Sequence, residues 1–474
     1  MEDKNISRRS AFQAGLTVGI GGLLGRSQVL GQEFANSRQV PGGQRPRGIV
    51  FLVSDGMSHG VLPLAEAFSQ QVRRKSTAWW QLLANAEAAH GLMDTPSSDS
   101  LVTDSAAAST AWSAGMRVPN GQICVDANGK NAESIGETLA GQGVRMGLVT
   151  TAKVTHATPA GFATNSVNRN DEAFIAPQFL DRAEILLGGG NKFFDPNHRR
   201  DGKDLYQQYL KGGYQVVNDR ESLLASKANK LLGVFSDDHL PYSIDRHQSK
   251  KLQAIVPTLA EMTEVALDRL LPGSKPFLLQ VEGARIDHAA HANDIGAILH
   301  DQIAFDDAVA TALACTAAHP DLLVVVTSDH GNANPALNGT GAGYRKTNES
   351  FSRIALCSQS HAQFLAQGRA QKENVAVWQR RFKKAFGFHP EKEEAEVILD
   401  SIAGRDIVEW HHQQDNPMGL MGQIIGNHTG TGWTGVSHTA DPTQITSLGP
   451  GAGRFGGLVR NDDVRDHLLE LLLG

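Results

Sequence analysis

The sequence predicts an α/β fold with a doubly wound, mostly parallel central sheet flanked by helices on both faces. Four short apolar runs lack the polar alternation of a half-exposed strand, which favours strands buried on both faces. They are Gly48–Val53, Met146–Val149, Phe277–Val281 and Leu322–Val326. Helical patterns such as Ala254–Leu271 and Asn293–His319 lie between or beside them. Alternating strands and helices are typical of doubly wound sheets.

Small and polar residues follow each of these runs. Asp55, Glu282 and Asp329 come directly after or close behind three of them. In open parallel sheets, ligands bind beyond the carboxyl ends of the strands. We therefore expect these carboxylates to meet at one edge of the sheet.

Composition excludes several classes of protein. The chain has 474 residues, of which 41% are hydrophobic and 20% charged, and this balance is typical of a globular protein. The net charge of −6 predicts no nucleic-acid partner, and no apolar run reaches the roughly 20 residues of a membrane span. Cys124, Cys315 and Cys357 form no CxxC pair. We expect buried free thiols rather than a disulfide framework.

The N-terminus has the pattern of an export signal. Arg8-Arg9 precede an uncharged, glycine-rich stretch from Ala14 to Gly25, which favours the twin-arginine route; a frayed cytosolic end is the alternative. We expect a signal over residues 1–31 with its cleavage site open, and a linker over 32–46. A single catalytic domain over 47–474 would then function in the periplasm or outside the cell.

Mixed acidic and imidazole side chains point to a metal centre. If a helix begins near Ile286, Asp287 and His291 lie four residues apart on one face. Asp329-His330 adds an oxygen and a nitrogen ligand. Each pattern alone also fits a turn, a helix cap or a surface pair. Together they suit zinc better than an all-oxygen cage, and two zinc ions about 4 Å apart could clamp a phosphoryl group.

A nucleophile and an anion-binding cation are also available. Ser105 stands just before an alanine-rich helix, where it could attack phosphorus or simply cap the helix. No Gly-x-Ser-x-Gly elbow supports a hydrolase triad. Arg169 offers a planar fork that matches phosphate, or it is an ordinary loop arginine.

The segment Val102–Ala107 closely resembles the nucleophile motif of the alkaline phosphatases. Asp55-Gly56, Val281–His291 and Asp329-His330 match that family in the same order. The resemblance implies an alkaline phosphatase-like fold and hydrolysis of phosphate monoesters through a phosphoserine at Ser105. It implies two zinc ions, one magnesium ion and a possible homodimer. The implied roles are Arg169 on phosphate; Asp55, Asp329 and His330 on one zinc; Asp287, His291 and a late histidine on the other; and Asp55, Glu282 and Thr158 on magnesium.

Two candidates exist for the late histidine. In the family this ligand leads into a strand that ends at a glycine eleven positions on, and His438 to Gly449 keeps that spacing. His428 lacks it, so we expect a structural role there. His156 and His288 replace an aspartate and a lysine of the enterobacterial form. They are expected beside the phosphate or behind the metal ligands, with weaker phosphate binding as the result.

The segment from about 345 to 426 carries no recognised motif. Within it, Gly387 and Pro390 separate a basic helix end from an acidic helix start. We expect the basic residues to be solvated rather than to steer phosphate. A phosphodiesterase, phosphonate hydrolase or sulfatase on the same fold, or a silent metal- or phosphate-binding protein, are the alternative functions.

Overall fold

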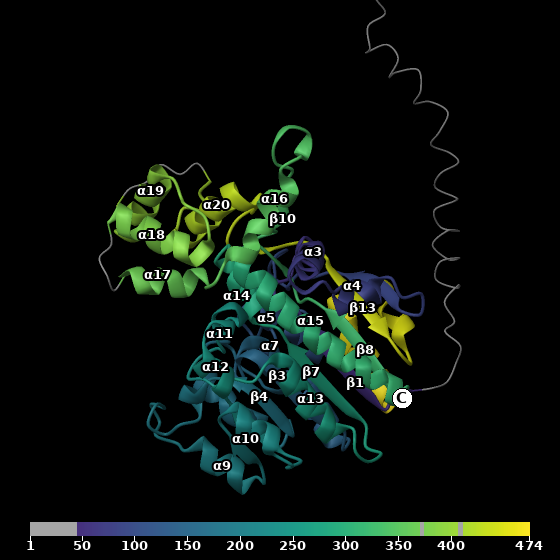
Figure 1. Ribbon diagram of the computed structural model, residues 1–474. Coiled ribbons are helices and arrows are strands. Elements are labelled where there is room, and N and C mark those ends of the chain that lie inside the picture. The colour runs from purple at the N-terminus through teal and green to yellow at the C-terminus, as the bar shows by residue number, and fades with distance from the viewer. Residues whose placement is uncertain (1–44, 370–373, 406–410) are drawn as a thin grey trace, which may run out of the picture. The chain divides into compact units, whose positions relative to one another are not determined.

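The computed structural model describes residues 45–369, 374–405 and 411–474, and the described residues from 45 onward form one compact unit (Figure 1). The predicted export signal, and the linker up to residue 44, lie outside the described residues. Among those described, no helix is both long and apolar enough to cross a bilayer.

A ten-stranded sheet is the centre of the unit. Within this sheet, β13 alone among the described strands runs antiparallel to both of its neighbours, so the predicted mostly parallel sheet is confirmed. In spatial order the strands are β14 (Gly457–Val459), β2 (Ala89–Met93), β13 (Thr443–Leu448), β8 (Leu322–Thr327), β1 (Gly48–Val53), β7 (Phe277–Glu282), β3 (Arg145–Lys153), β4 (Ile185–Gly189), β6 (Leu231–Val234) and β5 (Gln215–Val217).

Alternate side chains of β1 enter two separate cores. Val50 and Leu52 pack on one face with α13 (Leu259–Leu270) and α15 (Ile295–Ala318). Phe51 faces the other core, with α5 (Ser105–Ala114) and α7 (Ala157–Ala163). Helices therefore cover both faces, as predicted (Figure 1). Further α-helices are α3 (Val61–Arg73), α4 (Ala78–Leu83), α6 (Ile135–Gly141), α8 (Glu172–Ile175), α9 (Leu205–Lys211), α10 (Arg220–Ala225), α11 (Ser243–His247) and α21 (Val464–Leu473).

One predicted helix is confirmed only in its second part. The pattern Ala254–Leu271 divides into α12 (Lys250–Ile255) and α13, because Pro257 has no N–H to continue the helix. Thr258 then begins α13 with a capping box, its hydroxyl accepting from the Glu261 N–H. The pattern Asn293–His319 is confirmed as α15.

A group of helices lies to one side of the sheet and is called the satellite here. It comprises α16 (Thr347–Ser352), α17 (His361–Arg369), α18 (Val375–Phe386), α19 (Lys392–Ile402) and α20 (Pro417–Thr429) (Figure 1). As predicted, α18 ends at Gly387, which has a φ of 83°, and α19 begins after Pro390. Phe364, Trp378 and Phe382 form its buried aromatic centre.

The three cysteines are free. Cys124 and Cys357 are buried, as expected for inert thiols, and burial raises the pKa of Cys124 to about 12. The expectation of burial is wrong for Cys315, which is half-buried near the end of α15.

Candidate active site

Three carboxylates meet beyond the ends of adjacent strands. Asp55, Glu282 and Asp329 follow or end β1, β7 and β8, and all three are buried. Both oxygens of Asp55, one of Asp329 and one of Glu282 have no hydrogen-bond partner. Burial raises the pKa of Asp55 well above its usual value, that of Glu282 to about 7 and that of Asp329 to about 6. Such a concentration of buried acid calls for a cation.

His330 joins two of these acids to the candidate nucleophile. Its Nε2 lies 3.2 Å from Asp329 Oδ2, 3.7 Å from Asp55 Oδ1 and 3.2 Å from Ser105 Oγ. In a serine hydrolase triad the acid would hold the opposite ring nitrogen. Here Nδ1 lies 3.3 Å from the Gly331 carbonyl, whereas the Ser105 hydroxyl and both acids lie near Nε2. A shared cation explains this arrangement and a triad does not.

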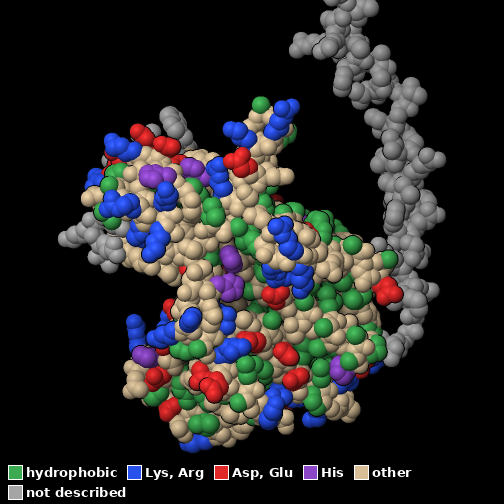
Figure 2. Space-filling model, viewed as in Figure 1, with side chains coloured by type: hydrophobic (Ala, Val, Ile, Leu, Met, Phe, Trp, Pro, Cys, Tyr) green, Lys and Arg blue, Asp and Glu red, His purple; other side chains and the backbone are tan. Residues whose placement is uncertain are grey.

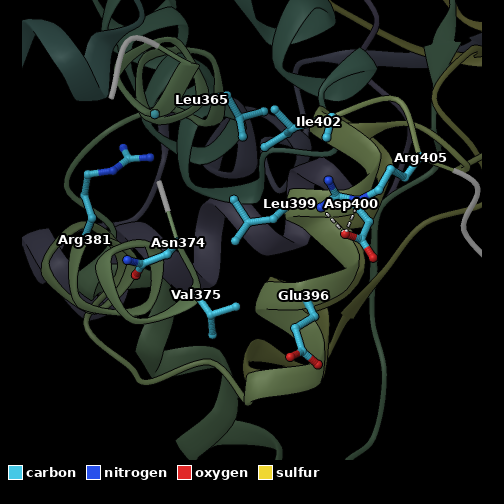
Figure 3. A pocket seen from close by; sticks show the side chains of 11 residues that line it. Leu365, Asn374, Val375, Arg381, Glu396, Leu399, Asp400, Ile402 and Arg405 are labelled. Atoms are coloured by element: carbon cyan, nitrogen blue, oxygen red, sulfur yellow. Dashed lines mark hydrogen bonds and ion pairs between the residues drawn. The ribbon is translucent and has the colours of Figure 1, made fainter. Parts of the chain in front are cut away.

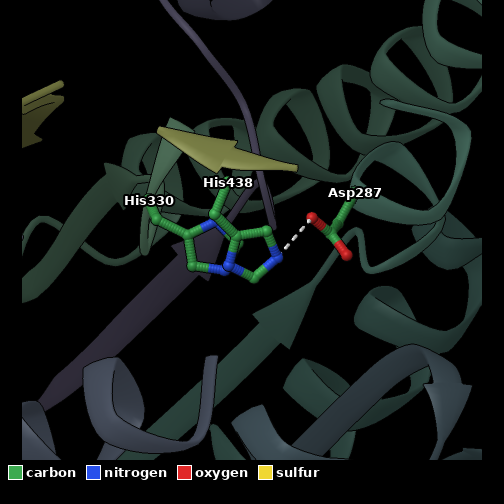
Figure 4. Close-up of side chains that lie close together, drawn as sticks. All are labelled: Asp287, His330 and His438. Atoms are coloured by element: carbon green, nitrogen blue, oxygen red, sulfur yellow. Dashed lines mark ion pairs between the residues drawn. The ribbon is translucent and has the colours of Figure 1, made fainter. Parts of the chain in front are cut away.

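A second group adjoins the first. On α14 (Arg285–His291), His291 Nε2 lies 3.4 Å from Asp287 Oδ2 and 3.1 Å from His438 Nε2. His438 Nε2 is 3.5 Å from Asp287 Oδ1 (Figure 4). Burial alone would lower the pKa of His291, but the Asp287 carboxylate raises it to about 9. The rings of His330 and His438 stack at 3.7 Å, so the two groups are continuous.

Short strand pairing brings His438 to this place. β12 (His438–Thr439) pairs antiparallel with β9 (Gly331–Asn332), with His438 opposite Asn332. The Asn332 amide donates to Asp287 Oδ1 at 2.7 Å. Gly56, with a φ of 66°, approaches Asp287 so closely that an added Cβ would lie 2.4 Å from its Oδ1. Asn332 was not anticipated from the sequence.

Backbone carbonyls orient the imidazole rings of His291 and His438. His291 Nδ1 lies 2.7 Å from the Val436 carbonyl, and His438 Nδ1 lies 2.8 Å from that of Thr103. His291 keeps 40% of its side chain exposed and His438 only 15%. Figure 2 shows histidine side chains near the middle of the viewed face, between the satellite and the rest of the unit.

His428 takes no part in these groups. Its Nε2 lies 3.3 Å from Glu394 Oε2, and its ring stacks on Phe388 at 4.4 Å. These contacts join α20 to α19 and its preceding loop within the satellite.

A third group of candidate ligands shares Asp55 with the first. Ligand atoms of Asp55, Glu282 and His156 lie within 4.8 Å of one another. Thr158, on α7, is fully buried and its hydroxyl has no partner. Arg169 Nη2 lies 3.2 Å from His156 Nε2, which must accept because a guanidinium only donates. His156 Nδ1 is left buried and unpartnered.

Asp104 prepares both Ser105 and Arg169. It is the N-cap of α5, with Oδ1 accepting from the Ala107 N–H at 2.9 Å, so the alternative that Ser105 caps the helix is wrong. Ser105 is the first helical residue and is buried. Asp104 Oδ2 accepts from Arg169 Nη1 and from the Gly121 N–H, both at 2.9 Å. The sequence pattern indicates the capping position of Asp104, but it does not indicate the ion pair of Asp104 with Arg169.

Three imidazoles line the side of the site beyond Arg169. The ring of His288 lies 5.5 Å from that of His156 and 4.3 Å from that of His239. Arg285 Nη1 donates to His288 Nδ1 at 2.8 Å, and its guanidinium lies 3.6 Å over the Tyr242 ring. Burial lowers the pKa of His288 and of His156, so both rings are neutral at pH 7. Sequence reasoning missed His239, Arg285 and Tyr242.

A cavity elsewhere has no such chemistry. About 640 Å³ lies among α17, α18 and α19, lined by Leu365, Val375, Leu399 and charged residues (Figure 3). Arg405 there pairs with Asp400, and none of the predicted site residues reaches it.

Comparison with known proteins identifies the family of the chain. A family model described as alkaline phosphatase matches residues 46–473. The chain belongs to the alkaline phosphatase family. It is 28% identical over 436 residues to alkaline phosphatase 3 of Bacillus subtilis (strain 168), covering 90% of this chain and 89% of that one. The crystal structure of the Thermus thermophilus alkaline phosphatase aligns with a TM-score of 0.85 and 35% identity, covering 91% of this chain and 92% of that chain.

A cold-active alkaline phosphatase from Shewanella aligns with a TM-score of 0.74 and 28% identity, over 90% of this chain and all of that chain. Membership makes the protein a phosphatase and supports hydrolysis of phosphate monoesters as its activity. The ligand clusters fit a family enzyme that uses metal cofactors.

Proposed function

We propose that this protein hydrolyses phosphate monoesters through a phosphoserine at Ser105, at a centre of two zinc ions and one magnesium ion. The observation that carries the proposal is the convergence of Ser105 Oγ and His330 Nε2 on two acids, Asp55 and Asp329, that keep buried oxygens without hydrogen-bond partners. Buried carboxylates with unpartnered oxygens beside a hydroxyl are unfavourable without a cation to balance their charge.

The donor sets fit the proposed ions. Asp55, Asp329 and His330 form one mixed oxygen and nitrogen set, and Asp287, His291 and His438 form the other; such mixtures suit zinc. Asp55, Glu282 and Thr158 offer the oxygens that suit magnesium. His156 adds a nitrogen to that third set, so metal analysis of the purified protein decides which ion it holds.

The residues divide the reaction between them. Bound zinc would supply positive charge that favours ionisation of the Ser105 hydroxyl and balances the negative charge on the phosphoryl oxygens and on the leaving alkoxide oxygen. The Ser105 oxygen attacks phosphorus in line, forming the P–O bond as the ester P–O bond breaks and the alcohol leaves with a proton from water. Water then cleaves the phosphoserine. Arg169, already oriented by Asp104, holds two nonbridging oxygens through both steps.

A matched pair of experiments tests the nucleophile. Ser105→Ala should abolish phosphoenzyme formation with labelled phosphate while equilibrium phosphate binding stays measurable, because Arg169 and the ligand sets remain. Ser109→Ala is the control, since Ser109 lies on the same helix and bonds to the Ala106 and Ala157 carbonyls instead. Normal labelling of Ser105→Ala would refute the assignment.

The rival activities are separated by substrate. A phosphate monoester, a diester and a sulfate ester are offered to the zinc-loaded protein, and we expect turnover of the monoester to dominate. A silent binding protein would hold zinc and turn over none of them. Chelation followed by zinc readdition should remove and restore activity.

Localisation and assembly are separate proposals. The paired Arg8-Arg9 support twin-arginine export to the periplasm or beyond, and replacement of both by Lys should leave the protein in the cytosol. A homodimer, expected only from the family resemblance, would show as twice the monomer mass in solution.

A further inference from the structure

The satellite reaches the metal-ligand segment at Asn293, two residues after His291. Asn293 is completely buried and has a φ of 45°, a left-handed conformation that Asn tolerates better than most residues. Its Nδ2 donates to the carbonyls of Ala290 and Gly435, at 3.1 and 2.8 Å. The side chain thus ties the end of α14 to the segment that leads into His438.

Gln414, in the loop that leads into α20 of the satellite, completes this arrangement. Its Nε2 donates to Asn293 Oδ1 at 2.9 Å, and the residue is 4% exposed. Gly419 on α20 lies against the Gln414 backbone, where an added Cβ would come within 2.5 Å of the carbonyl oxygen. Because Asn293 Oδ1 accepts from Gln414, the amide cannot flip, and both Nδ2 hydrogens stay directed at the two carbonyls.

A second contact holds the same segment from α17. The His361 N–H donates to Asp294 Oδ2 at 2.6 Å, and His361 Nδ1 lies 3.1 Å from the Ala292 carbonyl. Asp294 also caps α15 through Ala297. Residues 292–294 therefore make hydrogen bonds to two parts of the satellite, Gln414 and the start of α17.

The hydrogen bonds of Asn293 affect the positions of two proposed zinc ligands, His291 and His438. Gly435 precedes Val436, whose carbonyl orients His291, and His438 follows two residues later. Loss of the Asn293 bridge would free both segments to separate. We propose that Gln414 and Asn293 are positioning residues for the group Asp287, His291 and His438, and that the satellite thereby sets how tightly this group retains its zinc. The inference rests on the proposed zinc site.

The test measures zinc release rather than turnover. Gln414→Met keeps the length and volume of the side chain but removes the donor. Zinc is transferred from the loaded protein to a chromophoric chelator, and two release phases are expected from the wild type. In the variant one of the two phases should accelerate by about tenfold or more, the range seen when partners of metal ligands are lost. Added zinc should then restore activity by mass action.

Gln363→Met is the matched control, because Gln363 lies exposed on α17 of the same satellite and its side-chain amide donates to Gln359 Oε1 at 3.4 Å. It should release both ions at wild-type rates. Asn293→Gly tolerates the left-handed backbone and removes the whole bridge, so Gln414→Met should add nothing to it. This second variant also serves if the first folds poorly.

Three outcomes would overturn the inference. Both phases could stay at the wild-type rate in Gln414→Met, both could accelerate equally, or the two substitutions could act independently. Failure of the proposed function looks different: the wild type would then bind no zinc or would hydrolyse no monoester.

Discussion

Asp104→Asn tests how Arg169 is held. The substitution keeps the shape of the side chain, and Asn is as good an N-cap as Asp, so Oδ1 can still accept from Ala107. At the Oδ2 position, however, an NH2 group would face two donors, the Gly121 N–H and Arg169 Nη1. The helix should therefore persist while the arginine loses its anchor.

The magnitude follows from the exposure of the pair. A hydrogen bond to a charged group contributes about 1.5–3 kcal/mol when well buried. The Arg169 and Asp104 side chains are 21% and 18% exposed, so we take about 1 kcal/mol, which corresponds to about fivefold. Inhibition by inorganic phosphate should weaken by this factor, and KM should rise with it. Removing a negative charge acts in the opposite direction, but we expect loss of the fixed guanidinium geometry to dominate.

The assay is competitive inhibition by phosphate at fixed pH and zinc. Asp99→Asn is the control, since Asp99 lies in the preceding loop and bonds to Ser97 and Asn120 without reaching Arg169. Tighter phosphate binding in Asp104→Asn would show that charge outweighs anchoring and would refute the reasoning. A fivefold effect that persists when Arg169 is already Ala would refute it as well.

Three other predictions follow from buried charge. His288→Lys places a fixed positive charge where the imidazole is neutral. An added attraction of about 1 kcal/mol should lower the inhibition constant of inorganic phosphate by about fivefold. An unchanged inhibition constant would count against this reasoning. Burial raises the pKa of Asp301 to about 7. The folded state therefore binds its proton more tightly than the unfolded state, and stability falls as pH rises from about 4 to 7, by at most about 1.4 kcal/mol per pH unit. The free energy of unfolding of Asp301→Asn in urea should therefore rise relative to that of the wild type between pH 5 and 8. Parallel plots of unfolding free energy against pH for the two proteins would contradict this. Metal-free protein should likewise lose thermal stability as pH rises toward about 7, because burial raises the pKa of Glu282 to about 7, whereas protein loaded with zinc and magnesium should not.

The local half of the site could be predicted from sequence. Unbroken apolar runs predict buried parallel strands, and Asp55 and Asp329 come just after two such runs, so their placement at strand ends could be predicted. The four-residue spacing of Asp287 and His291 needed only one helix turn. Strands β5 and β14 have three residues each, too few for any periodic signal, and neither was anticipated.

The non-local half could not be derived from pattern. His438 meets Asp287 through a two-residue strand pair, and family resemblance alone selected it. Arg285 looks like an ordinary surface charge in the sequence, yet it is held over Tyr242 and directs His288. The contact between Gln414 and Asn293 spans 121 positions and joins two amides with no distinguishing neighbours.

The three imidazoles of the proposed zinc groups share one arrangement, and it argues that the site is built for cations. His291, His330 and His438 each direct Nδ1 at a backbone carbonyl, those of Val436, Gly331 and Thr103. A carbonyl only accepts, so Nδ1 carries a proton in each ring and Nε2 is the nitrogen left to face a metal ion. The Nε2 atoms of His291 and His438 then face one another at 3.1 Å. Two lone pairs at that distance would repel, so either one Nε2 carries a proton, in agreement with the raised pKa of His291, or a metal ion lies between the two rings. The chain thus holds its ligands in a geometry that only a bound positive charge makes favourable.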